Sequence, residues 1–189
     1  MATKRPPLSL KGRALAMLAQ REHSATELRR KLLRHAKLES AAALAARASP
    51  VGGEAPSDSP PSPSDAAARV DEVIAWLRDH RYLSEERFIE SRVHARASRY
   101  GNLRIRQELA QHGLSLPADA AQTLKDSELE RATEVWQRKF GQAPADAAGR
   151  ARQARFLAQR GFSPEVIARV LRQAGRARGG FSRGDPEAD

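Results

Sequence analysis

A ten-residue pattern that occurs three times without gaps constrains this chain more than any other feature. The three copies are ELRRKLLRHA from Glu27, RIRQELAQHG from Arg104 and RQARFLAQRG from Arg152. Leu32, Leu109 and Leu157 take the same place in the three copies, and Ala36, Gly113 and Gly161 end them. A unit of this size is too small to hold a good core alone, so neighbouring units must stack to bury their apolar sides.

Helical signals before and after each copy predict that it is the middle helix of a group of three. Ser24 and Glu27 form a capping box, Ser84 caps a helix that begins with two glutamates, and Ser163 precedes a proline at a first helical position. The sequence therefore predicts an all-α fold of three tandem three-helix, helix-turn-helix-like repeats in an elongated curved array. The predicted repeats span residues 8–83, 84–126 and 127–174, and residues 1–7 and 175–189 are predicted to be flexible tails.

One segment interrupts the first repeat. Of the 16 residues from Ser49 to Ser64, five are Ser, five are Pro and two are Gly. Such a composition buries too little apolar surface to offset the entropy of ordering the chain. We expect a disordered insertion here, with helical order returning at Asp65.

The charge of the chain indicates the chemistry of its partner. Lys plus Arg number 33 against 23 Asp plus Glu, which gives a net charge of +10. That balance favours a polyanion or an acidic protein surface as partner. No apolar run approaches the roughly 20 residues that span a bilayer, and no secretory signal is evident, so we expect a cytoplasmic protein without a membrane segment.

The stretch from Tyr82 to Gly113 combines helical order with concentrated positive charge. Its first helix has one apolar stripe, formed by Ile89, Val93, Ala97 and Tyr100. In the second helix of each repeat, we expect the Leu to point inward and the Arg or Gln to be exposed. Between Arg92 and Arg106 the stretch has no acidic residue, and we interpret its arginines as partner-binding rather than as a solvated face. The candidate residues are Arg92, Arg96, Arg99, Arg104 and Arg106.

The other two copies are also basic, and for them a solvated face and a binding face remain equally open. The first copy carries Arg29, Arg30, Lys31 and Arg34, and the third carries Arg150, Arg152 and Arg155.

The sequence lacks the patterns that mark enzymes and metal sites. It has no phosphate-binding glycine loop, no HExxH and no nucleophile elbow. There is no cysteine, and the five histidines are scattered without an i, i+4 pair. We therefore expect a non-enzymatic protein without cofactor or metal. Five aromatic residues could stack on bases, but their helical spacing favours core packing; they are Trp76, Tyr82, Trp136, Phe140 and Phe156.

Five motifs in fixed order resemble the RecX family of bacterial regulators of the RecA recombinase. They are REHSxxELRRKL from Arg21, YLxxxRF from Tyr82, GNxRIRQELxxxG from Gly101, KFG from Lys139 and RQxRFLxxRGFS from Arg152. The resemblance covers roughly Leu8 to Arg172. It departs at about residues 37–68, where relatives have a short connection.

The resemblance implies three tandem three-helix repeats, in agreement with the repeat above. It also implies a protein that binds the RecA–DNA filament in its helical groove, limits filament growth and dampens recombination and SOS-type proteolysis. The expected partners are the RecA filament and single- or double-stranded DNA, which the protein contacts directly or through the filament. The protein itself is expected to be a monomer. The alternative is a stand-alone DNA-binding protein that uses its repeats as helix-turn-helix readers.

Overall fold

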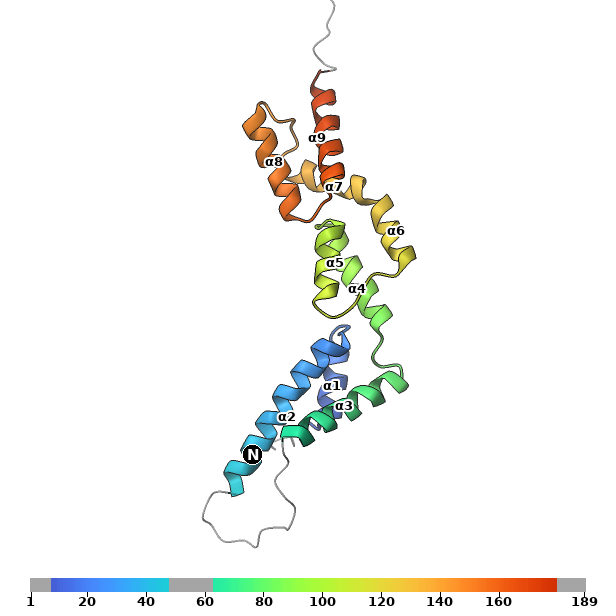
Figure 1. Ribbon diagram of the computed structural model, residues 1–189, viewed down its shortest axis with the longest axis vertical. Coiled ribbons are helices and arrows are strands. Elements are labelled where there is room, and N and C mark those ends of the chain that lie inside the picture. Colours follow the sequence, from blue (N-terminus) through green and yellow to red (C-terminus); the bar gives the residue numbers. More distant parts are fainter. Residues whose placement is uncertain (1–7, 48–62, 180–189) are drawn as a thin grey trace, which may run out of the picture. The chain divides into compact units, whose positions relative to one another are not determined.

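The computed structural model describes residues 8–47 and 63–179, and all regular structure within them is helical (Figure 1). The helices are α1 (Leu10–Leu18), α2 (Ala25–Arg47), α3 (Pro63–Asp79), α4 (Glu85–Ala97), α5 (Asn102–Ala110), α6 (Ala118–Asp126), α7 (Glu128–Lys139), α8 (Ala147–Gln159) and α9 (Pro164–Gly179). They form tandem groups of three, which confirms the predicted all-α repeat fold.

The predicted insertion and tails lie largely outside the described residues. Residues 1–7, 48–62 and 180–189 are not described, while Pro63 and Ser64 already belong to α3. The last helix continues beyond the predicted end at residue 174 to Gly179. The exact repeat boundaries remain a prediction.

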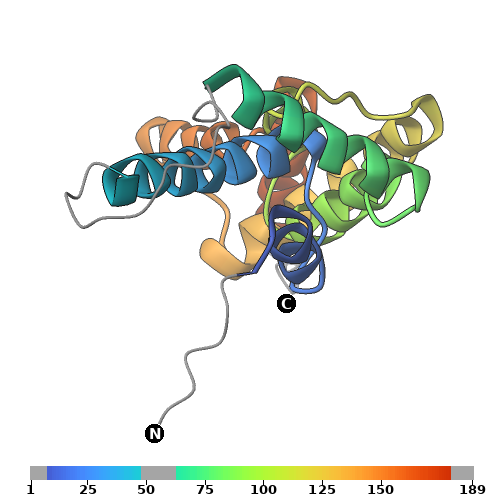
Figure 2. The same cartoon turned by 90° about the horizontal axis from the view of Figure 1, so that it is seen from below.

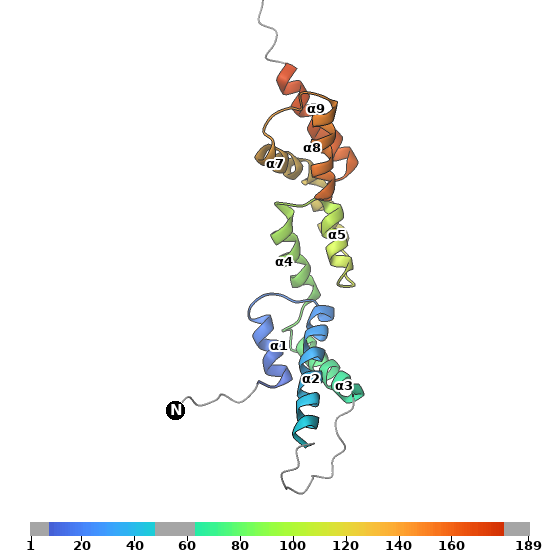
Figure 3. The ribbon, with the colours of Figure 1, turned by 90° about the vertical axis from the view of Figure 1, so that its left-hand side faces the viewer.

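The chain divides into two compact units, Met1–Phe88 and Ile89–Asp189. In the first, α1 and α3 pack against α2, as Figure 3 shows from the side. Leu28 and Leu32 of the repeated pattern are fully buried there. Ala36, the last residue of the pattern, is also fully buried. The alanine-rich sequence after it predicts a helix that continues to about residue 48, and α2 confirms this by running on to Arg47.

The second unit has its main core between α7, α8 and α9, which Figures 1 and 3 label and Figure 2 draws in orange and red. Leu157 is fully buried in this core, beside Phe162 and Val170. The expectation that every Gln of the repeated helix is exposed is wrong at Gln153, which is 5% exposed. Its side-chain oxygen accepts the indole N–H of Trp136 at 2.7 Å, and the amide of Gln153 donates to the carbonyl of Gln142 at 3.2 Å. Burial is tolerated because both polar atoms of this amide are satisfied.

Helices α4 and α5 lie side by side (Figures 1 and 3). Ile105 and Leu109 of α5 are fully buried, and Ile89 of α4 is 7% exposed. Of the predicted apolar stripe only Ile89 is buried, since Val93, Ala97 and Tyr100 are half-buried.

Two glycines bring the second and third repeats into backbone contact. The N–H of Gly101 donates to the carbonyl of Arg160 at 2.9 Å, and the N–H of Leu103 donates to the carbonyl of Gly161 at 3.0 Å. A Cβ atom on Gly101 would lie 2.2 Å from the carbonyl oxygen of Gly161. Gly161 itself has φ +80°, and a Cβ there would lie 2.5 Å from the backbone N of Arg104. Neither position has room for a side chain.

Three arginines of the third repeat bind the carbonyls at the C-terminal end of α4. Arg131 Nη1 donates to the carbonyls of Ala97 at 3.0 Å and Tyr100 at 2.9 Å. Arg138 Nη2 donates to the carbonyl of Ser98 at 2.7 Å, and Arg160 Nη1 donates to that of Arg99 at 3.2 Å. These carbonyls have no partner within the helix, and the negative end of the helix dipole favours cations.

Asn102, at the start of α5, is fixed by the same part of the third repeat. Its backbone N–H donates to Glu128 Oε1 at 3.1 Å, and its side-chain oxygen accepts Arg131 Nη2 at 2.7 Å. Asn102 and Glu128 are buried. Burial lowers the pKa of Arg131, and the nearby Glu128 opposes that shift. The second repeat is therefore joined to the third by buried polar contacts as well as by the glycines.

We expect Gly101→Ala to destabilise the second unit by about 1–3 kcal/mol or more, because its Cβ meets backbone that no rotamer change can move. Gly101 has φ −78°, so the loss would reflect the contact and not a strained backbone. The free energy of unfolding in urea, followed by far-ultraviolet circular dichroism, measures the effect.

Gly175→Ala is the matched control. Gly175 lies inside α9, and a Cβ atom there would have no neighbour within 4 Å, so alanine should stabilise the helix by about 0.5–1 kcal/mol. Equal effects of the two substitutions would show that the glycine contact does not hold the repeats together.

Candidate interaction surfaces

Three of the five predicted arginines meet in one groove between α4 and α5, called here the α4–α5 groove. It has a volume of about 250 Å³ and is lined by Arg92, Arg96, Arg104, Gln107, Glu108, Gln111 and His112. Arg106 is exposed on α5 but does not line this groove, and Arg99 lines a different hollow.

The groove contains a counter-charge that was not predicted for these arginines from the sequence. Arg96 Nε lies 2.9 Å from Glu108 Oε2, and Arg104 Nε lies 3.5 Å from Glu108 Oε1. The expectation that the arginines have no acidic partner is therefore wrong for these two. The i, i+4 spacing between Arg104 and Glu108 was the feature of the sequence that could have predicted their ion pair. The contact with Arg96 depends on the helix pair and has no such signal.

A second hollow, called here the Tyr100 pocket, lies where the end of α4 meets α7 and α8. Its volume is about 410 Å³, and its lining residues are Ser98, Arg99, Tyr100, Val135, Arg138, Lys139, Phe156 and Arg160. Four of these side chains are cationic and none is acidic. Of the four cations only Arg99 was a candidate from the sequence, because Arg138, Lys139 and Arg160 reach this place through the packing of the third repeat.

Aromatic rings lie among the cations of the Tyr100 pocket. The guanidinium carbon of Arg160 lies 4.5 Å from the ring centre of Phe156 and 6.0 Å from that of Tyr100. Phe156 also meets Phe140 edge to face at 5.2 Å. At such distances the face of an aromatic ring attracts a guanidinium.

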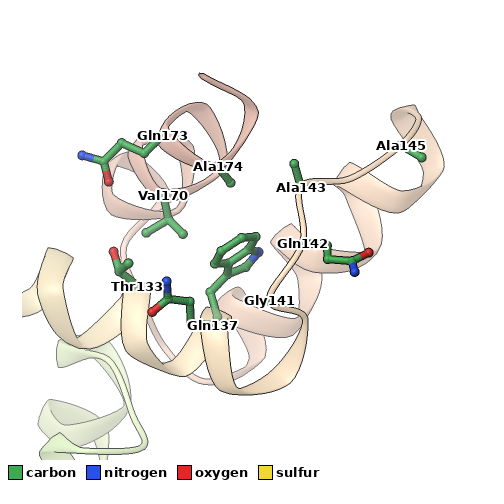
Figure 4. A pocket seen from close by; sticks show the side chains of 10 residues that line it. Thr133, Gln137, Gly141, Gln142, Ala143, Ala145, Val170, Gln173 and Ala174 are labelled. Carbon is green, nitrogen blue, oxygen red and sulfur yellow. The ribbon is translucent and has the colours of Figure 1, made fainter. Parts of the chain in front are cut away.

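A third hollow has a different character. It measures about 610 Å³ and lies between α7, the loop that follows it and α9, as the labelled side chains in Figure 4 show. Its lining residues carry no ionisable side chain and include Thr133, Gln137, Gln142, Val170 and Gln173. This hollow offers no charge to a polyanion.

The candidate cations of the first repeat are partly engaged within the fold. Arg29 donates from Nε and Nη2 to the two carboxylate oxygens of Asp71 at 2.6 and 2.8 Å, which holds the pKa of Asp71 below its ordinary value. Lys31 Nζ lies 3.2 Å from Glu27. Arg30 and Arg34 are exposed and, in the part of the chain that the structure describes, have no ion-pair partner.

The third repeat keeps its predicted cations at the surface. Arg150, Arg152 and Arg155 are exposed on α8, and none of them lines the hollows described above. The structure does not bring them together with the arginines of α4 and α5 in one hollow.

A buried carboxylate organises the start of α2. Glu27 is 7% exposed, and its carboxylate accepts Arg21 Nη1 at 3.2 Å and lies 3.3 Å from Nδ1 of the buried His23. Burial raises the pKa of Glu27, but hydrogen bonds from Arg21 and Lys31 outweigh it and hold the pKa at about 2. Burial lowers the pKa of His23, although the negative charge of Glu27 acts to raise it.

Neither a metal cluster nor a membrane span is found in residues 8–47 and 63–179. No three His, Cys, Asp or Glu side chains there are placed to hold a metal ion. None of the described helices is both long and apolar enough to cross a bilayer.

Comparison with known proteins assigns the family. A family model for the second three-helix domain of RecX matches residues 84–117, and one for the third matches residues 126–171. A "Regulatory protein RecX" of Leptothrix cholodnii is 46% identical over 176 residues, which cover 92% of this chain and 94% of the relative. The chain belongs to the RecX family.

Other RecX proteins match over nearly the same length. The relative from Ralstonia nicotianae is 42% identical, with 92% of this chain and 93% of the relative covered. One from Pseudomonas entomophila is 38% identical, with 87% and 91% covered. The α4–α5 groove lies within the stretch matched by the second RecX domain, whereas the Tyr100 pocket takes residues from both matched domains.

We expect the stability of the first unit to fall as the pH drops from about 4.5 toward 2. The pKa of Glu27 is about 2 in the fold against 4.5 as the ordinary value, so the unfolded chain takes up the proton first and is favoured in this window. Nuclear magnetic resonance of the carboxyl carbon should give a midpoint of about 2.

Arg21→Gln tests the cause of this shift, because the hydrogen bond from Arg21 is the largest of the interactions that lower the pKa. The midpoint of Glu27 should rise in that variant. A midpoint near 4.5 in both proteins would show that Glu27 is not held as an ion by these neighbours.

Proposed function

We propose that this RecX protein is a non-enzymatic, cytoplasmic regulator that binds the RecA–DNA filament as a monomer and limits its activities. These activities are filament extension, ATP hydrolysis, strand exchange and the coprotease function of the SOS response. Membership of the RecX family supports a regulatory role, since the matched relatives carry that name.

The α4–α5 groove is the observation that carries the proposal. Three guanidiniums converge on a hollow that also contains one carboxylate and two glutamine amides. A guanidinium binds a carboxylate through two parallel hydrogen bonds, and amides can donate to or accept from peptide groups. Mixed chemistry of this kind suits an acidic face of a protein such as RecA.

Glu108 keeps the groove ready for such a partner. It holds Arg96 and Arg104 on the groove wall before the partner arrives, which lowers the entropy lost when they bind. One carboxylate shared between two guanidiniums leaves positive charge unbalanced, and a carboxylate of the partner can share it.

Helix starts argue against the alternative of a stand-alone helix-turn-helix reader. Such a reader places the N-terminal residues of its recognition helix against base edges in the major groove. Asn102 at the start of α5 is buried, and the third helix of each repeat has an acidic residue in its first turn, which phosphates repel. These residues are Asp65, Asp119 and Glu165.

The test variant neutralises Glu108 together with the arginines of the groove, so that this half-buried carboxylate is not left as an unpaired ion. The variant Arg92→Gln, Arg96→Gln, Arg104→Gln, Glu108→Gln removes two net positive charges. Binding to RecA-coated single-stranded DNA, measured by fluorescence anisotropy, should weaken at least about tenfold, which equals about 1.4 kcal/mol. Inhibition of RecA ATP hydrolysis should require correspondingly more protein.

Lys125→Gln with Arg172→Gln is the matched control, because it removes the same net charge from exposed positions outside the three hollows. It should bind the filament like the wild type. If the groove variant folds and inhibits RecA as well as this control, the groove is a solvated face and the filament contact lies elsewhere.

A further inference from the structure

The Tyr100 pocket concentrates positive charge without an acidic lining residue. Arg99, Arg138, Lys139 and Arg160 come from α4's end, α7 and α8. Glu134 is the nearest acid along α7 to Arg138, and its backbone carbonyl, rather than its carboxylate, meets Arg138 Nε at 3.4 Å. The glutamate carboxylate is not part of the pocket lining.

The carbonyls at the end of α4 explain only part of this charge. Arg138 and Arg160 each use one nitrogen on such a carbonyl, at 2.7 and 3.2 Å, and a guanidinium retains further N–H donors when one nitrogen is engaged. Arg99 and Lys139 are exposed, and no ion pair or hydrogen bond of their side chains exists among the described residues. The side chains of Arg99 and Lys139 therefore do not contribute to holding the fold together.

Tyr100 connects this pocket to the α4–α5 groove. The guanidinium carbons of Arg96 and Arg104, which line the groove, lie 5.5 and 5.9 Å from the centre of its ring. The guanidinium carbon of Arg160, which lines the pocket, lies 6.0 Å from the same centre. Positive charge thus continues from one hollow to the other past a single aromatic ring.

We propose that the Tyr100 pocket binds the phosphodiester backbone of single-stranded nucleic acid. A pocket of cations without a carboxylate suits phosphates, whereas the groove with Glu108 and its glutamines suits a protein. Rings and ordered guanidinium planes offer stacking surfaces, which only unpaired bases can use. A single strand can also bend into a hollow of about 410 Å³, which a rigid duplex cannot enter.

This inference deepens the proposed function, because it names the DNA strand as the part of the filament that the pocket would contact. Its test contains no RecA, so it can succeed or fail separately from the proposed filament binding. The two surfaces are separated by variants that share no residue.

The probe is a fluorescent oligothymidylate of about 16 nucleotides, the upper end of the length that one single-strand-binding domain covers. The variant Arg99→Gln with Lys139→Gln removes only the two cations without internal partners, so its melting temperature should match that of the wild type. Its affinity should fall about tenfold. The slope of log affinity against log salt should become shallower by about 1.4, since each single-strand phosphate contact contributes about 0.7.

The control Lys125→Gln with Arg172→Gln carries the same net charge and should keep the wild-type affinity and slope. Tyr100→Leu, in which the ring is lost and the charge is kept, should weaken binding without changing the slope. A duplex of equal length should bind more weakly than the single strand.

Three results would overturn the proposal. Equal losses in the pocket variant and the charge control would mean that only net charge attracts the strand. Duplex binding equal to single-strand binding would remove the role assigned to unpaired bases. Poly-glutamate that displaces the oligonucleotide at equal charge concentration, with the same dependence on Arg99 and Lys139, would assign the pocket to an acidic protein.

Discussion

The arrangement of the second unit depends on hydrogen bonds that arginines of the third repeat donate to the last carbonyls of α4. A helix that ends inside a protein leaves carbonyls that must find donors, because burying them without partners costs free energy. Arg131 meets two of these carbonyls and also the side chain of Asn102. One half-buried guanidinium thereby fixes the end of α4 and the start of α5 in relation to α7.

Two glycines make these arginine–carbonyl hydrogen bonds geometrically possible. Gly101 and Gly161 let two turns exchange hydrogen bonds between backbones, at a separation that any Cβ atom would prevent. Close approach of the backbones brings Arg138 and Arg160 within reach of the carbonyls of Ser98 and Arg99. The Tyr100 pocket is thus a consequence of how the repeats join, and its cations are oriented by the contacts that hold the fold.

Sequence reasoning succeeded where the signal is local and periodic. Leu32, Leu109 and Leu157 were aligned from the pattern alone, and all three are fully buried. It failed where a contact joins distant segments. Arg138 lies 40 residues from Ser98, and Arg160 lies 61 from Arg99, so no spacing rule connects them. Gln153 is an intermediate case, because the repeat itself indicates that its position is buried. Leu28 and Ile105 occupy the same position in the other two copies, and both are buried.

The repeated helix carries its charges differently in each copy. The first and fifth positions form an ion pair in two copies with opposite polarity, Glu27 with Lys31 and Arg104 with Glu108. In the third copy they are Arg152 and Phe156, and the ring turns into the Tyr100 pocket lining. The pattern therefore determines which positions are buried and leaves the charge of the others free.

The cations of the Tyr100 pocket consequently need not follow the repeat. Arg99 follows α4, and Arg138 and Lys139 lie in the last turn of α7, all outside the ten-residue pattern. Cations near the C-terminal end of a helix are favoured by its dipole, and where two helix ends meet they accumulate without acidic neighbours. Repetition builds the frame of this chain, and the junction between two repeats concentrates the positive charge that a polyanionic partner would meet.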